Sequence, residues 1–299
     1  MTDLPVAEVV RRAGGRAETA LLLQRVPRRA LDRALRSGEV VRAARGVYAL
    51  PSLPPARAVA VRARGVLSHA SAAAHHGLKM VTEPDAVHVS VPHGRRPEPV
   101  DGVRYHYRTL PPDDVTRAGV TTPLRTVLDC AAVMPFREAL AVADSALRSD
   151  LLFPDELRAG AAVLRGPFSA GPRRVAAHAD GRAANPFESA LRAVLLDAGI
   201  RAFTPQVTIR TTAAGTTTTA RVDLADAGLR LVVEGDSYTY HGGRAAFSAD
   251  CRRYDELVRA RWIVLRFTWE HVMFDDAWLV GVVRDVIAWR REELGRRSA

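Results

Sequence analysis

In the C-terminal third of this chain, segments with the apolar spacing of strands alternate with a segment that has the apolar spacing of a helix. Residues 222–224 and 229–234 have the apolar character of two short strands, joined by a turn at 226–228. Residues 247–257 have the spacing of a helix with one apolar face, and residues 262–267 predict a further strand. This alternation predicts an α/β unit with a mixed sheet.

Residues 1–50 predict three helices followed by a two-stranded hairpin. Helical spacing covers residues 6–13, 17–24 and 28–37, and strands are predicted at 40–42 and 47–50. Arginines crowd the third helix and the hairpin tip, at Arg28, Arg29, Arg33, Arg36 and Arg45. This order is that of a winged helix-turn-helix, which inserts its third helix into the major groove of DNA. A small helical cap with solvated arginines is the alternative, and the order of elements favours DNA binding.

A second α/β segment is predicted at residues 51–168. It opens with a proline-rich linker at 51–65, and its strands are expected at 87–91 and 103–107. Helices are expected at 70–76, 122–133, 135–147 and 154–164. His69, His75 and His76 lie at the first of these helices. Because no acid or cysteine completes a ligand set, we interpret these three as capping or core histidines.

The remainder of the chain divides into a linker and a further domain. Residues 169–184 are rich in arginine and alanine and predict a linker or a short helix before a domain at 185–299. Residues 211–219, which include four consecutive threonines, predict an exposed hairpin loop. A C-terminal helix with one apolar stripe is expected at 278–293.

Composition narrows the class of protein. The 299 residues are 47% hydrophobic, and no apolar run approaches the roughly 20 residues of a membrane span. The first residues have no secretory-signal pattern, so a cytoplasmic protein is expected. Cys130 and Cys251 lack zinc-site spacing, and each is expected to be a small buried side chain. The net charge of +10 favours a polyanionic partner.

Three acids gather around the predicted hairpin near the C-terminus. Asp223 lies near the end of its first strand, Glu234 ends the second, and Asp236 leaves on the same side. Such carboxylates repel one another unless a cation lies among them, and hard oxygen ligands suit Mg²⁺ or Mn²⁺. A solvated hairpin edge is the alternative. The buried run at 231–233 before Glu234 favours the metal site.

An ordered set of residues between 185 and 287 points to a known family. The set consists of Glu188, Gly199-Ile200, Pro205-Gln206, Val222-Asp223, Glu234-x-Asp236, His241, Asp250-x-x-Arg253 and Trp262-x-Val264-Leu265-Arg266-Phe267. It resembles the actinobacterial domains of uncharacterised function related to Vsr mismatch endonucleases, within the PD-(D/E)XK nuclease superfamily. The resemblance covers about a third of the chain. It implies a restriction-endonuclease-like α/β/α core with a mixed sheet.

The resemblance also implies a metal-dependent phosphodiesterase. Asp223 and Glu234 would hold Mg²⁺ or Mn²⁺, with Asp236 as a third or second-metal ligand. Glu188 would approach the site from the opening helix.

One departure from the superfamily concerns its lysine. The motif has a lysine two residues after the second acid, where this chain has Asp236, and the one lysine of the chain is Lys79. His241 is then the candidate general base or leaving-group acid. Arg253 is expected either to pair with Asp250 or to hold the scissile phosphate.

A second ordered set lies in the N-terminal half. It consists of Ala30-Leu31-x-x-Ala34-Leu35, Arg45-Gly46-Val47-Tyr48, Ser68-His69-x-Ser71-Ala72-Ala73, Gly77-Leu78, Val87-His88-Val89-x-Val91-Pro92 and Thr122-x-x-Arg125-Thr126-x-x-Asp129. It resembles the AbiEi family of antitoxins over roughly half of the chain. The resemblance implies autoregulatory DNA binding by the winged helix and neutralisation of a cognate toxin by the domain that follows.

Together these patterns predict a multi-domain α/β protein. We expect a winged helix at 1–50, an AbiEi-like α/β domain at 51–168, a linker at 169–184 and a Vsr-like nuclease domain at 185–299. The expected function is DNA binding with metal-dependent endonuclease activity, in DNA repair or phage defence. The rival hypothesis is a non-enzymatic antitoxin or transcriptional autoregulator with an inactivated nuclease fold, favoured by the missing lysine and by Gly235.

Overall fold

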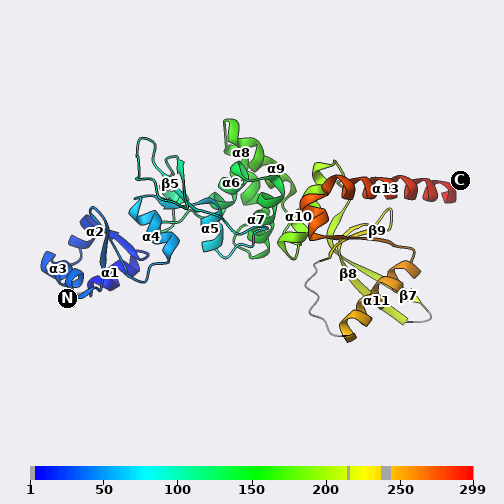
Figure 1. Ribbon diagram of the computed structural model, residues 1–299, viewed down its shortest axis with the longest axis horizontal. Coiled ribbons are helices and arrows are strands. Elements are labelled where there is room, and N and C mark those ends of the chain that lie inside the picture. The colour runs from blue at the N-terminus through cyan, green and yellow to red at the C-terminus, as the bar shows by residue number, and fades with distance from the viewer. Residues whose placement is uncertain (1–3, 214–215, 237–243, 299) are drawn as a thin grey trace. The chain divides into compact units, whose positions relative to one another are not determined.

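The computed structural model describes residues 4–213, 216–236 and 244–298. The chain forms two compact units (Figure 1). The N-terminal unit contains Met1–Leu78, Thr82–Val133 and Ala159–Pro172, and the C-terminal unit contains Lys79–Val81, Met134–Arg158 and Arg173–Ala299. Among the residues described, no helix is long and apolar enough to cross a membrane.

Three helices and a three-stranded sheet begin the N-terminal unit. The helices are α1 (Val6–Arg12), α2 (Thr19–Leu23) and α3 (Arg28–Ser37), and the strands are β1 (Arg16–Glu18), β2 (Val41–Ala44) and β3 (Val47–Ala49). The sheet is antiparallel in the order β1–β3–β2. Strand β1 was not expected, and it shortens the helix predicted at 17–24. Leu22 rather than its neighbours fills the core, since Leu21 and Leu23 are exposed.

The third helix has the bounds that the sequence predicts. Gly38 ends it with a backbone φ of 78°, a left-handed conformation that glycine adopts without a steric cost. Leu31 and Ala34 are buried and pack with Val10, Leu22 and Tyr48. Burying each large apolar side chain contributes about 1.5–3 kcal/mol, which fixes the orientation of the helix and leaves its other face in solvent.

A helix replaces most of the predicted linker at 51–65. Helix α4 (Pro55–Arg62) begins at a proline, whose fixed φ suits the first helical turn. Its Arg57 donates a hydrogen bond to the carbonyl oxygen of Ala118 at 2.8 Å and another to that of Gly14. This arginine therefore joins the first helices to the middle of the N-terminal unit.

A second small sheet forms the middle of this unit. Its strands are β4 (Val66–Leu67), β5 (Val87–Val91) and β6 (Val103–Tyr107), and its helices are α5 (His69–His75) and α6 (Pro123–Val133), with a 3-10 turn at Pro112–Asp114. Strand β5 pairs antiparallel with β4 and parallel with β6. Leu67, Val89, Val91 and Val120 form its core. Cys130 is buried as predicted, whereas Cys251 is exposed and the prediction for it is wrong.

Helices follow where helices were predicted. They are α7 (Phe136–Arg148), α8 (Pro154–Val163) and α9 (Ala170–His178), with a 3-10 turn at Pro167–Ser169. Helix α9 occupies much of the segment predicted as a linker or short helix.

The C-terminal unit is built on a four-stranded mixed sheet. Its elements are α10 (Pro186–Asp197), β7 (Thr204–Ala213), β8 (Thr216–Asp226), β9 (Leu231–Asp236), α11 (Arg244–Arg259), β10 (Ile263–Thr268), α12 (Trp269–Phe274) and α13 (Asp276–Ser298). Strands β7, β8 and β9 form an antiparallel meander, and β10 pairs parallel with β9. The sheet order is β10–β9–β8–β7.

The threonine tract is a strand, so the loop predicted at 211–219 is wrong. Thr218 and Thr219 belong to β8 and pair with Thr211 and Arg210 of β7. The side-chain oxygens of Thr211 and Thr218 are 2.6 Å apart. Threonine is β-branched and suits a pleated strand, so this preference outweighs the polarity that indicated a loop.

Strand β9 lies at the centre of the core and is buried on both faces. Leu231 and Val233 pack in the cluster that contains α10, α12 and α13, whereas Val232 packs with Leu257 of α11. Because side chains alternate along a strand, Glu234 lies on the same face as Val232 and therefore faces α11. This register places a charged residue in a buried position.

A buried ion pair joins α7 to α10 in the C-terminal unit. Arg192 donates to both carboxylate oxygens of Asp144, at 2.8 and 3.0 Å, and Ser189 donates to the same carboxylate at 2.8 Å. Asp144 is 0% exposed and Arg192 is 7% exposed. Removing one partner of such a pair leaves an uncompensated buried charge.

We expect Asp144→Ala to lower the free energy of unfolding by about 3–5 kcal/mol, because Arg192 then stays buried without its carboxylate. Urea denaturation of the full chain measures this. The matched control is Asp197→Ala, which breaks the half-exposed pair between Arg174 and Asp197 and should cost at most about 1 kcal/mol. Equal losses in the two variants would contradict the prediction.

Candidate functional site

The acids singled out in the sequence lie on α10, β8 and β9. Glu188 is in the first turn of α10, where the side chain of Asn185 caps the helix by accepting from the Glu188 amide at 3.0 Å. Asp223 lies within β8, not at its end, because β8 continues to Asp226. Asp223 accepts a hydrogen bond from the Gly235 amide of β9 at 3.0 Å. The antiparallel pairing of β8 and β9 thus brings Asp223 next to the Glu234–Asp236 stretch, as the sequence predicted.

Gln206 of β7 connects two of these acids. Its side-chain nitrogen donates to Glu188 Oε2 at 2.6 Å and lies 3.4 Å from Asp223 Oδ1. Its backbone φ is +55°, a left-handed conformation that few residues other than glycine adopt. Such strain persists where the surrounding structure imposes it, and it often marks a functional site.

Burial and mutual repulsion disfavour the ionised forms of Glu188 and Asp223. Glu188 is 4% exposed, and burial raises its pKa. Burial, together with the neighbouring Glu188 carboxylate, raises the pKa of Asp223 to about 7. In the described part of the chain no arginine forms an ion pair with either acid. The ionised forms of these two neighbouring carboxyl groups are therefore destabilised in the folded protein.

Glu234 is engaged by cationic and hydroxyl donors from α11. Arg253 donates to its two carboxylate oxygens at 2.8 and 3.0 Å, and the hydroxyl of Tyr254 donates to one of them. Arg253 also donates to Asp250 at 3.0 Å, so of the two roles left open by the sequence the structure shows the pairing with Asp250. A fork-shaped guanidinium satisfies a buried carboxylate with two parallel hydrogen bonds.

Asp236 is held by a different arginine. Arg266 of β10 pairs with Asp236, and the same guanidinium lies 3.6 Å from Asp250. Parallel pairing sets Thr268 opposite Asp236 and Arg266 opposite Glu234, which brings this arginine to the end of β9. Two of the three predicted metal ligands therefore face guanidinium groups.

Arginines occupy two of the three predicted ligands for Mg²⁺ or Mn²⁺ in this arrangement. A cation of this kind needs several oxygen atoms directed at one point. In the described residues Asp223, Glu234 and Asp236 do not form a group of converging ligand atoms, since arginines occupy Glu234 and Asp236. Glu188 and Asp223 are the acids that remain without an arginine partner there.

Gly235 has a packing explanation. A Cβ added at this position would lie 2.8 Å from a ring carbon of Phe187 in α10. Close packing between α10 and β9 therefore requires glycine here.

Several residues of this site had no predicted role, and one predicted residue is not among those that the structure describes. His241 is outside the described residues, so its role stays a prediction. Gln206, Tyr254 and Arg266 contact the acids, although no role was predicted for these three residues. Tyr254 directly follows Arg253, which was expected to bind an acid. This position next to Arg253 was the sequence signal that could have identified Tyr254 as part of the site.

The N-terminal unit presents the predicted basic surface on α3. Its arginines, namely Arg28, Arg29, Arg33 and Arg36, are all exposed, and so is Arg45 at the turn between β2 and β3. Arg28 pairs with Asp32 at 3.3 Å within the helix. Arg29 and Arg33 have no carboxylate partner in the part of the chain that the structure describes. These cations are therefore available to an anionic partner.

A basic cavity lies in the same unit. Its volume is about 880 Å³, and its lining comes from α1, β1 and the region of β4 and β5. Seven arginines line it, namely Arg12, Arg16, Arg25, Arg64, Arg95, Arg108 and Arg117. Burial lowers the pKa of Arg16, which means that its charge lacks full compensation. The cavity adds to the positive field of this unit.

These features define a multi-domain α/β protein with a basic helical surface in one unit and a cluster of acids and arginines in the other. A family model described as "Transcriptional regulator, AbiEi antitoxin" matches residues 26–51, the segment of α3 and the β2–β3 hairpin. Two proteins of Mycobacterium tuberculosis, uncharacterized protein Rv2248 of strain H37Rv and uncharacterized protein MT2308 of strain CDC 1551, are each 30% identical over 245 residues. These alignments cover 80% of this chain and 89% of each relative. The chain belongs to the family of these mycobacterial proteins.

The chain was also compared with solved structures, and a mycobacterial protein is among those that match. The crystal structure of the RV2827C protein from Mycobacterium tuberculosis matches 68% of this chain and 82% of its own, at 19% identity and a TM-score of 0.30.

We expect the contribution of Asp223 to the free energy of unfolding to fall as the pH rises from about 4 to 7, whatever the other titrating groups contribute to the total. Asp223 has a folded pKa of about 7, above its unfolded value of 3.8, so the folded state binds more protons across this window. Asp223→Asn mimics the neutral carboxyl and should flatten this fall, raising stability at pH 8 by on the order of 2 kcal/mol.

Urea denaturation at several pH values measures the difference. The control is Asp285→Asn, which changes an exposed acid of α13 and should leave the pH profile as it is. A wild-type profile in Asp223→Asn would show that this carboxyl is not destabilised by folding.

Proposed function

We propose that this protein is a DNA-binding transcriptional regulator of the AbiEi type, whose N-terminal winged helix docks on duplex DNA. The observation that carries the proposal is the exposed arginine face of α3, which lies within the segment matched by the AbiEi regulator model. Three helices followed by the β2–β3 hairpin support a winged helix. A cognate toxin is the further partner that this family assignment favours.

The electrostatics of α3 fit a phosphate backbone. Leu31 and Ala34 form the buried apolar face of the helix, so the arginines project from the opposite side. Arg45 extends the basic surface to the hairpin turn. Duplex DNA carries one negative charge per about 1.7 Å of its axis, and each neutralised phosphate releases counterions. Affinity for DNA should then depend strongly on salt.

Replacing Arg29 and Arg33 together by alanine should weaken duplex binding and reduce the slope of log K against log salt by roughly two. Fluorescence anisotropy at several salt concentrations measures this. The charge-matched control replaces Arg158 and Arg165, which are exposed and lie outside α3. If both double variants change the slope equally, the loss reflects net charge and the contact surface is not α3.

A second candidate function is metal-dependent cleavage of phosphodiesters by the C-terminal unit. The order α10–β7–β8–β9–α11–β10, with β10 parallel to β9, supports a restriction-endonuclease-like core. Glu188, Asp223 and Glu234 come from its first helix and its second and third strands. The raised pKa of Asp223 is the specific observation in favour, because strongly perturbed acids cluster at functional sites.

The same site sets a condition on this second function. The acids would have to hold Mg²⁺ or Mn²⁺, which would supply charge neutralisation for phosphodiester cleavage. To gather Asp223, Glu234 and Asp236 around such an ion, Arg253 and Arg266 would first have to release their carboxylates. If these ion pairs persist in the presence of metal, the protein is a non-enzymatic regulator and its nuclease-like fold serves only for binding.

The assay that separates these functions incubates the full chain with Mg²⁺, Mn²⁺ or EDTA on single-stranded, duplex and mismatched DNA. If the nuclease is active, Asp223→Asn should reduce metal-dependent cleavage by a hundredfold or more while duplex binding is unchanged. Asp285→Asn serves as the control. His241→Ala should slow cleavage with little change in Mn²⁺ affinity if His241 transfers a proton. A wild type that cleaves no substrate with either metal leaves the regulator as the function.

A further inference from the structure

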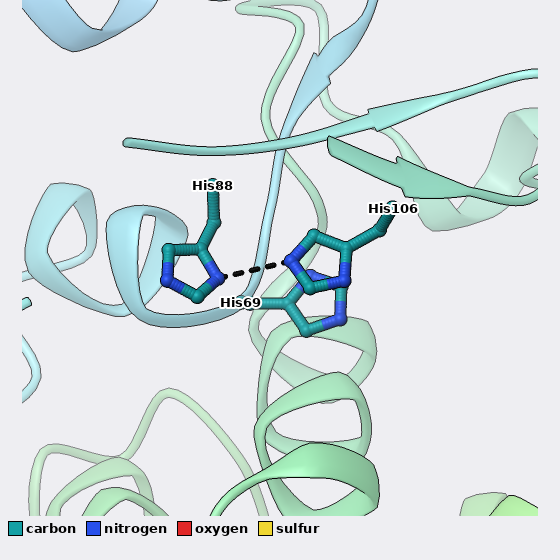
Figure 2. A group of neighbouring side chains, drawn as sticks. All are labelled: His69, His88 and His106. Atoms are coloured by element: carbon teal, nitrogen blue, oxygen red, sulfur yellow. Dashed lines mark hydrogen bonds between the residues drawn. The ribbon is translucent and has the colours of Figure 1, made fainter. Parts of the chain in front are cut away.

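Three histidines from separate elements meet in the N-terminal unit. His69 is the first residue of α5, His88 lies on β5 and His106 lies on β6. Parallel pairing sets Ser90 opposite His106 and Arg104 opposite His88, so both strand histidines lie on one face of the sheet. Figure 2 shows the three rings gathered at this face, with His69 against His106.

The distances place their nitrogen atoms close together. Nδ1 of His88 lies 3.0 Å from Nε2 of His106, and the rings of His69 and His106 stack with centroids 3.5 Å apart. One ligand atom from each residue can be chosen so that all lie within 4.8 Å of one another. Among the described residues, these three histidines are the group of potential metal ligands whose ligand atoms lie this close together.

We propose that His69, His88 and His106 form a binding site for a divalent transition-metal ion that prefers imidazole ligands, with Zn²⁺ as the first choice. Zn²⁺ binds histidine nitrogen at about 2.0–2.1 Å in tetrahedral geometry, which separates two ligand nitrogens by about 3.3 Å. The spacing of 3.0 Å between His88 and His106 is already near this value. The third imidazole needs to approach by at most about 1.5 Å and to turn out of its stacked orientation, because a metal ion lies in the plane of each imidazole ring that binds it.

The chemistry of the donor set selects the ion. Three imidazoles suit Zn²⁺, Co²⁺, Ni²⁺ and Cu²⁺, whereas Mg²⁺ and Ca²⁺ require oxygen ligands. Three protein ligands leave a fourth tetrahedral position for water or another molecule. This site therefore differs in metal class from the acids of the C-terminal unit.

The site is preorganised by hydroxyl groups. Ser68 Oγ lies 2.9 Å from His69 Nδ1, and Ser90 Oγ donates to Ser68 Oγ at 2.9 Å. In the tautomer where Nδ1 of His69 donates to Ser68, Nε2 carries the lone pair for the metal. Hydrogen bonds of this kind orient metal-binding histidines and increase their basicity. His69 also has a backbone φ of +51°, which is strained for a residue with a side chain.

Burial keeps these imidazoles in the neutral form that binds metal. His69 is 3% exposed and His88 is 7% exposed. Burial, followed by repulsion from the other rings, lowers the pKa of His69 to about 2 and that of His106 to about 4. Arg108 and Arg125 lie nearby, and the buried carboxylate of Asp129 pairs with both. This carboxylate offsets part of the positive charge that surrounds the site.

Titration of the full-length, metal-free protein with Co²⁺ and Zn²⁺ tests the proposal. We expect one ion per chain with micromolar or tighter affinity, and Co²⁺ should show the visible absorption of a tetrahedral site, which Zn²⁺ then displaces. His106→Gln should weaken Zn²⁺ binding at least tenfold, because it removes a ligand. The matched control is His75→Gln, which changes an exposed histidine of the same helix that lies outside the group and should bind as the wild type does.

The outcomes separate a metal site from buried histidines that only fill the core. If the wild type gives no tetrahedral Co²⁺ spectrum, or if His106→Gln binds Zn²⁺ as tightly as the wild type, the proposal is overturned. Circular dichroism without metal checks that each variant is folded. Should His106→Gln fail to fold, His88→Gln provides the second ligand variant. A rise of the thermal midpoint with Zn²⁺ in the wild type and in His75→Gln, but in neither ligand variant, supports the site.

Discussion

The burial of strand β9 on both faces governs the architecture of the C-terminal unit. Leu231 and Val233 pack toward one set of helices, Val232 packs toward α11, and the alternation of the strand then forces Glu234 inward at 5% exposure. A buried carboxylate is costly unless it is paired and hydrogen-bonded. Arg253 and Tyr254 supply those bonds from α11. The packing of the sheet against α11 therefore also determines which groups bind Glu234.

Arginine performs the same task throughout the chain. Asp144 is paired with Arg192, Asp129 with Arg108 and Arg125, and Glu234 with Arg253. The planar guanidinium stays charged and binds a carboxylate with two parallel bonds, which suits buried pairs better than the ammonium of lysine does. The abundance of arginine therefore contributes to the interior as well as to the basic surface, and net charge alone overstates the share available to DNA.

The two units offer metal ions opposite environments. In the C-terminal unit the oxygen ligands Glu234 and Asp236 are held by arginines, so a hard cation competes with existing ion pairs. In the N-terminal unit two buried imidazoles, His69 and His88, lie beside the half-buried imidazole of His106, and a hydrogen bond links the rings of His88 and His106. An ion there replaces one N–H···N contact rather than several charged pairs. The nitrogen site therefore imposes the smaller rearrangement on the protein.

The sequence by itself determined most element positions, because apolar spacing and glycine or proline boundaries are local signals; α3 and the strands β5 and β6 have the predicted bounds. It also identified Asp223, Glu234 and Asp236 as neighbours, since a hairpin fixes its own pairing, whereas the approach of Glu188 was implied by the family resemblance. Tertiary structure alone decided which partners those acids have. It also decided that His69, interpreted as a capping or core residue, meets His88 and His106. Such contacts join residues far apart in the chain, and no local spacing encodes them.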